Sequence, residues 1–214
     1  MYSVAKQQLR KRIKPIHRYF RAEKVNLFLR TMNGASAARR LLDVGGGPGV
    51  DGEFLPLYSH FSEVTVANIE PKVFHAPGVT VRSLVADGRS LPFASGSFDW
   101  VFSNAVIEHV GHWEDQVRFA EEIRRVARCG YFVTTPNRYF PIEPHTLIPF
   151  YQFLPVPVQR RVAPHSPGYL RSYELINLLS ASQMKMLFPE ANVVAVGFPV
   201  MGNSLVAAHR SNLA

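Results

Sequence analysis

The sequence has little cysteine, little acidic charge near its start and no long apolar run. Cys129 is the only cysteine among 214 residues, which excludes an intrachain disulfide and a metal cluster built from thiolates. No apolar stretch approaches the roughly 20 residues that cross a bilayer. Charged residues are scattered over 6–30, where a secretion signal would need an apolar core. These absences predict a cytoplasmic protein, and 214 residues suit one domain with a sizeable core.

The net charge of +8 is concentrated at the N-terminus. Residues 1–40 hold eleven lysines and arginines against Glu23 alone, whereas the rest of the chain carries a net charge of −2. A basic segment of this kind suits an anionic membrane surface, a nucleic acid or an anionic substrate, and a solvated helix face would explain it equally well. Apolar spacing over 4–32 predicts one or two helices, kinked or divided at Pro15.

Apolar runs alternate with helical patterns through the rest of the chain. The predicted strands span residues 40–44, 63–69, 79–86, 98–103, 131–135, 193–197 and 204–209, and the predicted helices span 50–58, 113–126 and 171–187. This alternation predicts an α/β fold with a seven-stranded, mostly parallel sheet and helices on both faces. The last two strands are too close together for a helical crossover, so the sheet should end in an antiparallel strand.

A glycine-rich turn follows the first predicted strand. Residues 41–49 read LLDVGGGPG, which places the carboxylate of Asp43 directly before the turn. Glycines allow the backbone to turn sharply and to approach a ligand closely, and the amides of such a turn form a polar cradle. A carboxylate would repel a phosphate but suits an ammonium group. The turn therefore predicts a nucleoside ligand that carries an amino acid.

Four further segments accompany this turn, namely VTVANIEP at 64–71, ADGRSLPF at 86–93, FDWVFSNAVIEHV at 98–110 and GYFVTTPN at 130–137. In this order and at this spacing, the five segments resemble the class I S-adenosylmethionine-dependent methyltransferases, in particular the ubiquinone and menaquinone biosynthesis enzymes. The resemblance implies a Rossmann-like fold, with S-adenosylmethionine as methyl donor and S-adenosylhomocysteine as product. It also implies a small-molecule acceptor, which we expect to be apolar or lipid-linked.

The resemblance places the cofactor site at the ends of four predicted strands. Its expected residues are Asp43, Gly45, Gly46, Gly47, Gly49, Asn68, Ile69, Glu70, Asp87, Gly88, Asn104 and Ala105. In the family, an acidic residue after the second strand holds both ribose hydroxyls. Asn68 stands at that position here, and Glu70 is preferred for the role because residues two apart share one face of a strand. Asp87 and Gly88 are expected to contact the adenine.

Three residues are candidates for catalysis on the acceptor, namely His109, Glu143 and His145. His109 would lie near the transferable methyl group, as a base or as a residue that orients an acceptor hydroxyl. Glu143 and His145 are a carboxylate and an imidazole two residues apart. Two ligands do not make a metal site, so no metal is expected.

Two segments should cover the site of a single domain formed by residues 1–214. Eight of the sixteen prolines fall within 136–168 and alternate with aromatic residues. This composition is too apolar for a disordered linker. We expect an ordered acceptor-site cap over 136–170, inserted after the fifth strand, and a basic helical cap over 1–34.

Three other functions are weighed against this one. A nucleic-acid methyltransferase would use the basic N-terminus, but no aromatic-basic RNA module or base-methylation motif accompanies it. A catalytically silent binding protein of the same fold is favoured only by Asn68 at an acidic position. A nicotinamide-dependent oxidoreductase is suggested by the G-x-G-x-x-G pattern of Gly47, Gly49 and Gly52, but Asp43 disfavours it.

Overall fold

The protein is described by a computed structural model over residues 4–32, 40–47, 54–72 and 75–211. Its centre is a seven-stranded sheet in the order β3-β2-β1-β4-β5-β7-β6. The strands are β1 (Arg40–Val44), β2 (Glu63–Asn68), β3 (Thr80–Val85), β4 (Phe98–Asn104), β5 (Ala127–Pro136), β6 (Asn192–Val196) and β7 (Ser204–Arg210). Strand β7 pairs antiparallel with both β5 and β6, and the other pairs are parallel. The predicted fold class is confirmed.

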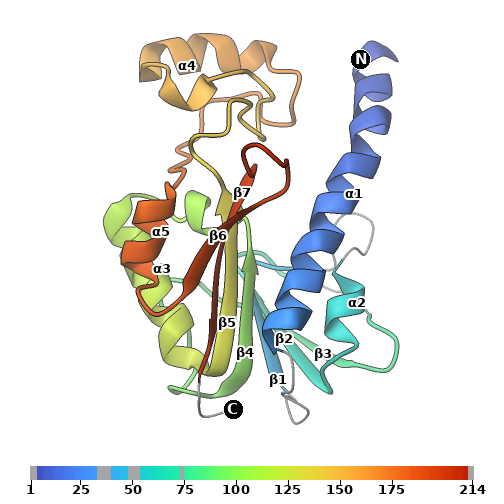
Figure 1. The fold of residues 1–214 in the computed structure, drawn as a ribbon, viewed down its shortest axis with the longest axis vertical. Helices are drawn as coiled ribbons and strands as arrows, with labels where there is room; N and C mark the ends of the chain where they lie inside the picture. The colour runs from blue at the N-terminus through green and yellow to red at the C-terminus, as the bar shows by residue number, and fades with distance from the viewer. Residues whose placement is uncertain (1–3, 33–39, 48–53, 73–74, 212–214) are drawn as a thin grey trace.

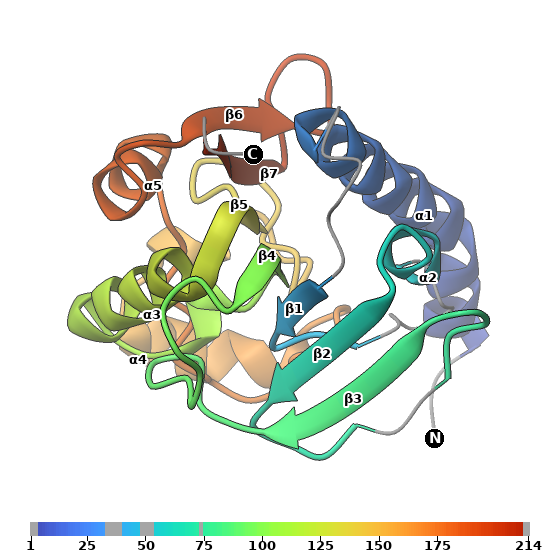
Figure 2. The ribbon, with the colours of Figure 1, turned by 90° about the horizontal axis from the view of Figure 1, so that it is seen from below.

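Helices cover both faces of the sheet (Figure 2). Helices α1 (Val4–Met32) and α2 (Leu55–Tyr58) lie on one face, and α3 (Trp113–Val126) and α5 (Ala181–Leu187) lie on the other. The central strands are therefore buried on both sides, which explains why β1 and β4 read as nearly continuous apolar runs. Two apolar cores result, one on each side of the sheet.

The segment between β5 and α5 forms a separate layer beyond the strand ends. It contains the 3-10 helices η2 (Tyr151–Phe153) and η3 (Ala163–His165) around helix α4 (Val156–Val162). Figure 1 shows this segment, hereafter the cap, at the same end of the sheet as the N-terminal half of α1. The cap follows the carboxyl end of β5, where ligands of open α/β sheets bind.

Helix α1 is continuous through Pro15, so residues 4–32 form one of the predicted one or two helices and are not divided at Pro15. Pro15 lies inside the helix and is exposed to solvent. A proline removes one backbone hydrogen bond, but at an exposed position water can satisfy the carbonyl that loses its partner. No helix within the residues that the structure describes is both long and apolar enough to cross a membrane.

The predicted helix over 171–187 is also wrong in its first half. Only Ala181–Leu187 is helical. The preceding residues run alongside the site, where the Asn177 amide donates to the Glu108 carbonyl. The helix starts at Ser180, whose side chain and that of Gln183 cap each other's backbone amides. The apolar spacing before Ser180 is typical of a helix, but hydrogen bonds to distant residues favour a non-helical conformation there.

Phe28 fixes α1 to the sheet. Its side chain is fully buried, and its ring centroid lies 5.4 Å from that of Trp100, 5.6 Å from Phe102 and 5.1 Å from Phe132. These three rings belong to β4 and β5, at the centre of the sheet. Aromatic pairs at such distances contribute beyond the area they bury. Phe28 therefore carries much of the energy that holds α1 in place.

We expect Phe28→Ala to lower the free energy of unfolding by about 3–5 kcal/mol, because it removes a buried ring and leaves a cavity. Urea denaturation followed by circular dichroism measures the change. Arg30→Ala, on the exposed side of the same helix, is the matched control and should change stability by less than about 0.5 kcal/mol. Equal, small effects of the two substitutions would show that α1 is anchored elsewhere.

Candidate active site

A cavity of about 290 Å³ opens at the carboxyl ends of the central strands. It lies where the strand order reverses between β1 and β4, which is the usual ligand site of an open α/β sheet. Seven residues predicted for the site line it, namely Gly45, Asn68, Ile69, Asp87, Gly88, Ala105 and His109. The other lining residues are Val44, Ala67, Ala86, Arg89, Val106, Val110 and Phe119.

The turn after β1 requires glycine at two of its positions, Gly45 and Gly46. Gly45 has a φ of +72°, and a Cβ added there would lie 2.5 Å from Val106 Cγ2. A Cβ on Gly46 would overlap the carboxyl group of Asp43. The backbone can therefore pass between the end of β4 and the Asp43 side chain only without side chains of its own. Gly49, also predicted for the site, lies outside the described residues.

Asp43 is buried directly beneath this turn. The Tyr58 hydroxyl makes a short hydrogen bond to Asp43 Oδ2 and lies 3.1 Å from the Gly47 carbonyl oxygen. Burial raises the pKa of Asp43 to about 7, against the opposing hydrogen bonds from Tyr58 and the Gly47 backbone. An ionised Asp43 is therefore costly unless a positive charge comes near it.

The structure separates the two candidates for a ribose contact. Asn68 lines the cavity, donates from Nδ2 to the Gly46 carbonyl at 3.1 Å and accepts from the Glu70 amide at 3.1 Å. Glu70 is exposed, outside the cavity lining, and its carboxylate pairs with Lys72 Nζ at 3.0 Å. The geometry therefore favours Asn68 over the preferred Glu70, and the contact itself stays a prediction.

Asp87 is held as a carboxylate by a residue that the sequence pattern did not single out. Arg89 Nε lies 3.0 Å from each Asp87 carboxyl oxygen, and its Nη1 reaches Asp115 at 3.1 Å. The hydrogen bond from Arg89 lowers the pKa of Asp87. Gly88 brings the backbone against an apolar wall, since a Cβ there would lie 2.5 Å from the Phe119 ring. The Asp87 carboxylate and the Phe119 ring thus line the same cavity. This pairing of a hydrogen-bond acceptor with an apolar surface suits a purine, which has a polar edge and an apolar face.

The two predicted residues at the end of β4, Asn104 and Ala105, differ in whether they line the cavity. Ala105 lines the cavity with a φ of +55°, which is uncommon for a residue with a side chain. Asn104 is not part of the lining. Its Oδ1 accepts from Thr134 Oγ1 at 2.8 Å and lies 3.4 Å from Lys24 Nζ. Asn104 therefore supports the strand end, whereas the Ala105 backbone meets the cavity.

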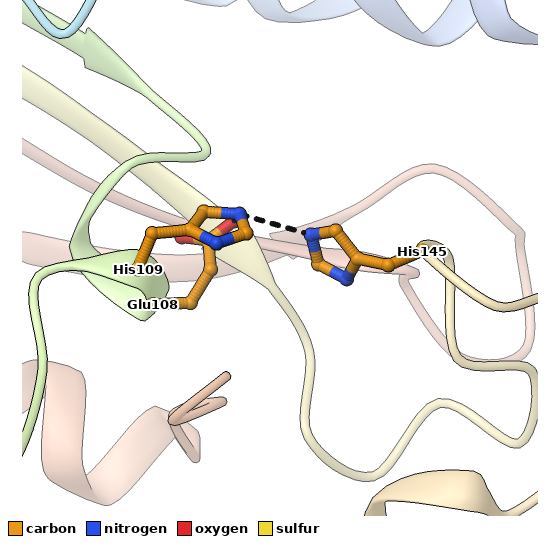
Figure 3. Close-up of side chains that lie close together, drawn as sticks. All are labelled: Glu108, His109 and His145. Atoms are coloured by element: carbon orange, nitrogen blue, oxygen red, sulfur yellow. Dashed lines mark hydrogen bonds and ion pairs between the residues drawn. The ribbon is translucent and has the colours of Figure 1, made fainter. Parts of the chain in front are cut away.

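The three predicted catalytic residues come together in one chain of contacts (Figure 3 shows its histidines with Glu108). His109 belongs to the 3-10 helix η1 (Ile107–His109), and its Nε2 lies 3.1 Å from His145 Nε2 in the cap. His145 Nδ1 makes a short contact with Glu143 Oε1. Thr146 holds the other Glu143 oxygen through its amide at 2.7 Å and its hydroxyl at 2.8 Å. The sequence spacing could not show that residues 109 and 145 meet.

The charges of this chain follow from its surroundings. Burial pushes the pKa of Glu143 up, but hydrogen bonds from His145 and Thr146 outweigh it and hold that pKa below its ordinary value. Burial, with the charge of His145, lowers the pKa of His109 to about 4. The ionised Glu143 carboxylate accepts the proton on His145 Nδ1. In the neutral tautomer assigned on this basis, the lone pair lies on His145 Nε2. His109 is then a neutral imidazole at physiological pH.

Glu108 and Lys24 are buried beside this chain and were not predicted to be functional. Glu108 Oε2 accepts from Thr135 Oγ1 at 3.0 Å. Burial raises the pKa of Glu108 to about 6, and the charges of His145 and Lys24 act against that rise. For Glu108, the position next to His109 was the only sign of a functional role in the sequence. Lys24 comes from the distant α1, and nothing in the local sequence marks it.

The sequence matches known methyltransferases over its first strands. Residues 42–134 match a family model described as a methyltransferase domain. An uncharacterized methyltransferase of Mycobacterium sp. strain KMS is 41% identical over 96 residues, which make up 43% of this chain and 36% of that protein. One from Mycobacterium tuberculosis strain H37Ra is 36% identical over 121 residues, 50% of this chain and 42% of that protein. The chain therefore spans less than half the length of these curated relatives.

Solved structures agree on the fold. Magnesium protoporphyrin IX methyltransferase from Synechocystis, crystallised with S-adenosylmethionine, matches with a TM-score of 0.59 at 14% identity, over 99% of this chain and 86% of that one. A methyltransferase from Aquifex aeolicus matches with a TM-score of 0.55 at 13% identity, over 97% of both chains. At such identities the likeness concerns the fold alone.

The narrower resemblance to the ubiquinone and menaquinone enzymes stays a prediction. The broader one is confirmed, because the family model, the bacterial relatives and the seven-stranded fold agree. Residues 42–134 are therefore similar to the methyltransferase domain, and the described residues have the fold that S-adenosylmethionine-dependent methyltransferases share.

Proposed function

We propose that this chain transfers a methyl group from S-adenosylmethionine to a small acceptor that is apolar or lipid-linked. The observation that carries the proposal is the cavity between the ends of β1 and β4, because it joins a glycine turn, an ionised Asp87 and His109 in one space. S-adenosylmethionine would supply an activated methyl group on a sulfonium. The task left to the protein is mainly to position the acceptor and to exclude water.

The residues present fit this cofactor. Asp87 accepts hydrogen bonds, as the amino group of an adenine requires, and Phe119 offers an apolar surface beside it. Asn68 has an amide group at the cavity wall for a ribose hydroxyl. Asp43 lies under the glycine turn, where the ammonium of the methionine moiety would stabilise its ionised form.

The histidine chain is proposed to serve the acceptor. With the Glu143 carboxylate holding Nδ1–H of His145, the Nε2 atom of His145 accepts from Nε2–H of His109. His109 then presents Nδ1 as an acceptor for a hydroxyl proton. With a pKa near 4, His109 orients such a hydroxyl rather than removing its proton fully at neutral pH.

An apolar or lipid-linked acceptor is supported by the surface around the cap. Most exposed large apolar side chains of the described residues lie in the cap or nearby, namely Tyr139, Ile142, Phe150, Phe153, Val156, Val158, Tyr169, Leu175, Phe198, Val200 and Met201. The loop between β6 and β7 meets the cap through Phe198, whose ring stacks on Phe140 at 5.3 Å. Exposed Arg160 and Arg161 lie on α4. Apolar groups beside cationic ones suit an anionic membrane surface.

Cofactor binding provides the first test. S-adenosylhomocysteine should bind the wild type in calorimetric titration, and Asp87→Ala or Asn68→Ala should each weaken the affinity by about ten-fold or more, because each removes a hydrogen bond to the ligand. Glu70→Ala is the matched control and should change it by less than about two-fold. Loss of binding in Glu70→Ala alone would return the ribose role to Glu70. A folded wild type that binds neither form of the cofactor would refute the proposed function.

Asp43 should lower stability as the pH rises. Its folded pKa of about 7 lies above the unfolded value of 3.8, so its carboxyl favours folding at low pH and loses that advantage between about pH 4 and 7. Relative to Asp43→Asn, the wild type should therefore lose about 2–3 kcal/mol of unfolding free energy between pH 5 and 8. Urea denaturation of both proteins at the two pH values measures this, and parallel pH profiles would contradict it. The same substitution should weaken S-adenosylhomocysteine binding.

Membrane association can be measured by sedimentation with anionic phospholipid vesicles. Replacing Val200 and Met201 together by serine should reduce the bound fraction several-fold, because both are exposed apolar residues of the loop between β6 and β7. Met186→Ser, at an exposed apolar site on α5 away from this loop, should leave the bound fraction unchanged. Absence of vesicle binding would exclude a membrane surface, and equal binding by all three proteins would exclude the loop between β6 and β7 as the contact.

A further inference from the structure

Three possible metal ligands converge where η1 meets the cap. One carboxylate oxygen of Glu108 and one ring nitrogen each of His109 and His145 all lie within 4.8 Å of one another. The two imidazole nitrogens are 3.1 Å apart, and His109 Nε2 lies 4.0 Å from Glu108 Oε1. Figure 3 shows His145 approaching from the cap, with Glu108 and His109 side by side on η1.

We propose that Glu108, His109 and His145 bind a divalent first-row transition metal ion of the zinc type. Two imidazoles and one carboxylate are a common ligand set for such ions. Zn–N bonds of about 2.0–2.1 Å in a tetrahedral site place two ligand nitrogens about 3.3 Å apart. The observed spacing of the two Nε2 atoms is therefore within a few tenths of an ångström of what the ion requires.

Glu108 supplies an independent reason. Its Oε1 atom is buried and has no hydrogen-bond partner among the described residues, although Oε2 is bonded to Thr135. A buried carboxylate oxygen without a partner costs free energy. Oε1 belongs to the same group of converging atoms as the two histidine nitrogens. A cation at their centre would satisfy it.

His145 is oriented as metal-binding histidines commonly are. Its Nδ1 is held by Glu143, and Glu143 is fixed in turn by the amide and hydroxyl of Thr146. A carboxylate on Nδ1 sets the tautomer and leaves the Nε2 lone pair for a metal. His109 offers the same lone pair when its proton lies on Nδ1. In that state the ion replaces the hydrogen bond between His109 Nε2 and His145 Nε2, and the metal-bound form is an alternative to the histidine chain described above. Glu143 therefore acts as a positioning residue rather than as a ligand.

The surrounding charge also suits a dication. Two buried carboxylates, Glu108 and Glu143, stand against one buried ammonium, Lys24, whose charge acts on Glu108. A bound cation would bring a second positive charge beside these two carboxylates.

The ion would define the class of acceptor. Three protein ligands leave at least one coordination position for water or a substrate atom, and His109 lines the cavity. An acceptor with an ionisable oxygen would suit that position, because a metal ion lowers the pKa of a bound hydroxyl. This last step rests on the proposed function, whereas metal binding itself does not.

The test is titration of the full chain with Zn²⁺ in competition with a chromogenic chelator, and with Co²⁺ followed by its visible absorption. The wild type should bind one ion per chain. His109→Ala and His145→Ala should each weaken the affinity by at least about ten-fold. His165→Ala, an exposed histidine in the cap, is the matched control and should bind as the wild type does. Glu108→Gln should also weaken binding, and circular dichroism shows whether that buried variant is folded.

Two results would overturn the metal site. One is a folded wild type that binds neither ion stoichiometrically, and the other is equal affinity in His109→Ala, His145→Ala and His165→Ala. Because His109 is only partly buried, its variant should fold and keeps the test decisive. S-adenosylhomocysteine binding by the same preparations separates the two proposals. Cofactor binding without metal binding would refute only the metal site, and metal binding without cofactor binding would refute only the proposed function.

Discussion

The turn at Gly45 is the constraint on which the rest of the site depends. Its left-handed backbone lets the chain pass within contact distance of Val106, at the end of a neighbouring strand. The Gly45 amide donates to the Ala67 carbonyl at 2.7 Å, and the Gly46 carbonyl accepts from Asn68. The ends of β1, β2 and β4 are thereby held around one cavity. A side chain at Gly45 would push these strand ends apart.

Buried charge is the second organising feature. Asp43, Glu108, Glu143 and Lys24 are almost fully buried near the carboxyl ends of the strands. Burial alone would neutralise such groups, and each is paired to a different degree. Among the described residues, Glu143 has several donors, Asp43 has Tyr58 and the Gly47 backbone, and Glu108 has no hydrogen-bond partner for Oε1. A cationic ligand is proposed beside the last two groups, namely the cofactor ammonium at Asp43 and a metal ion at Glu108.

The cap links the chemistry to the surface. His145 reaches His109 from one side of the cap, while side chains such as Phe150 and Phe153 are exposed on it. The cap is also tied to the domain, because the Arg138 amide donates to the Leu179 carbonyl and the Asn137 side chain donates to Gly202. A substrate that displaced the exposed rings would therefore act on a segment that also positions the histidine pair.

Local sequence determined most of the sheet. The pattern over Trp113–Val126 predicted α3 to the residue, because its apolar spacing and its burial coincide. Gly45, Asp87 and Gly88 line the cavity, where the family resemblance of their segments placed them, and their contacts with a cofactor stay predictions. The tertiary structure alone decided what depends on contacts between distant segments. It chose Asn68 over Glu70 at the cavity wall, kept residues 171–179 out of a helix and placed His145 against His109. The tertiary structure also buries Lys24 and Glu108 close enough for their charges to interact. The free energy of a buried charge depends on its neighbours in space, which local sequence does not show.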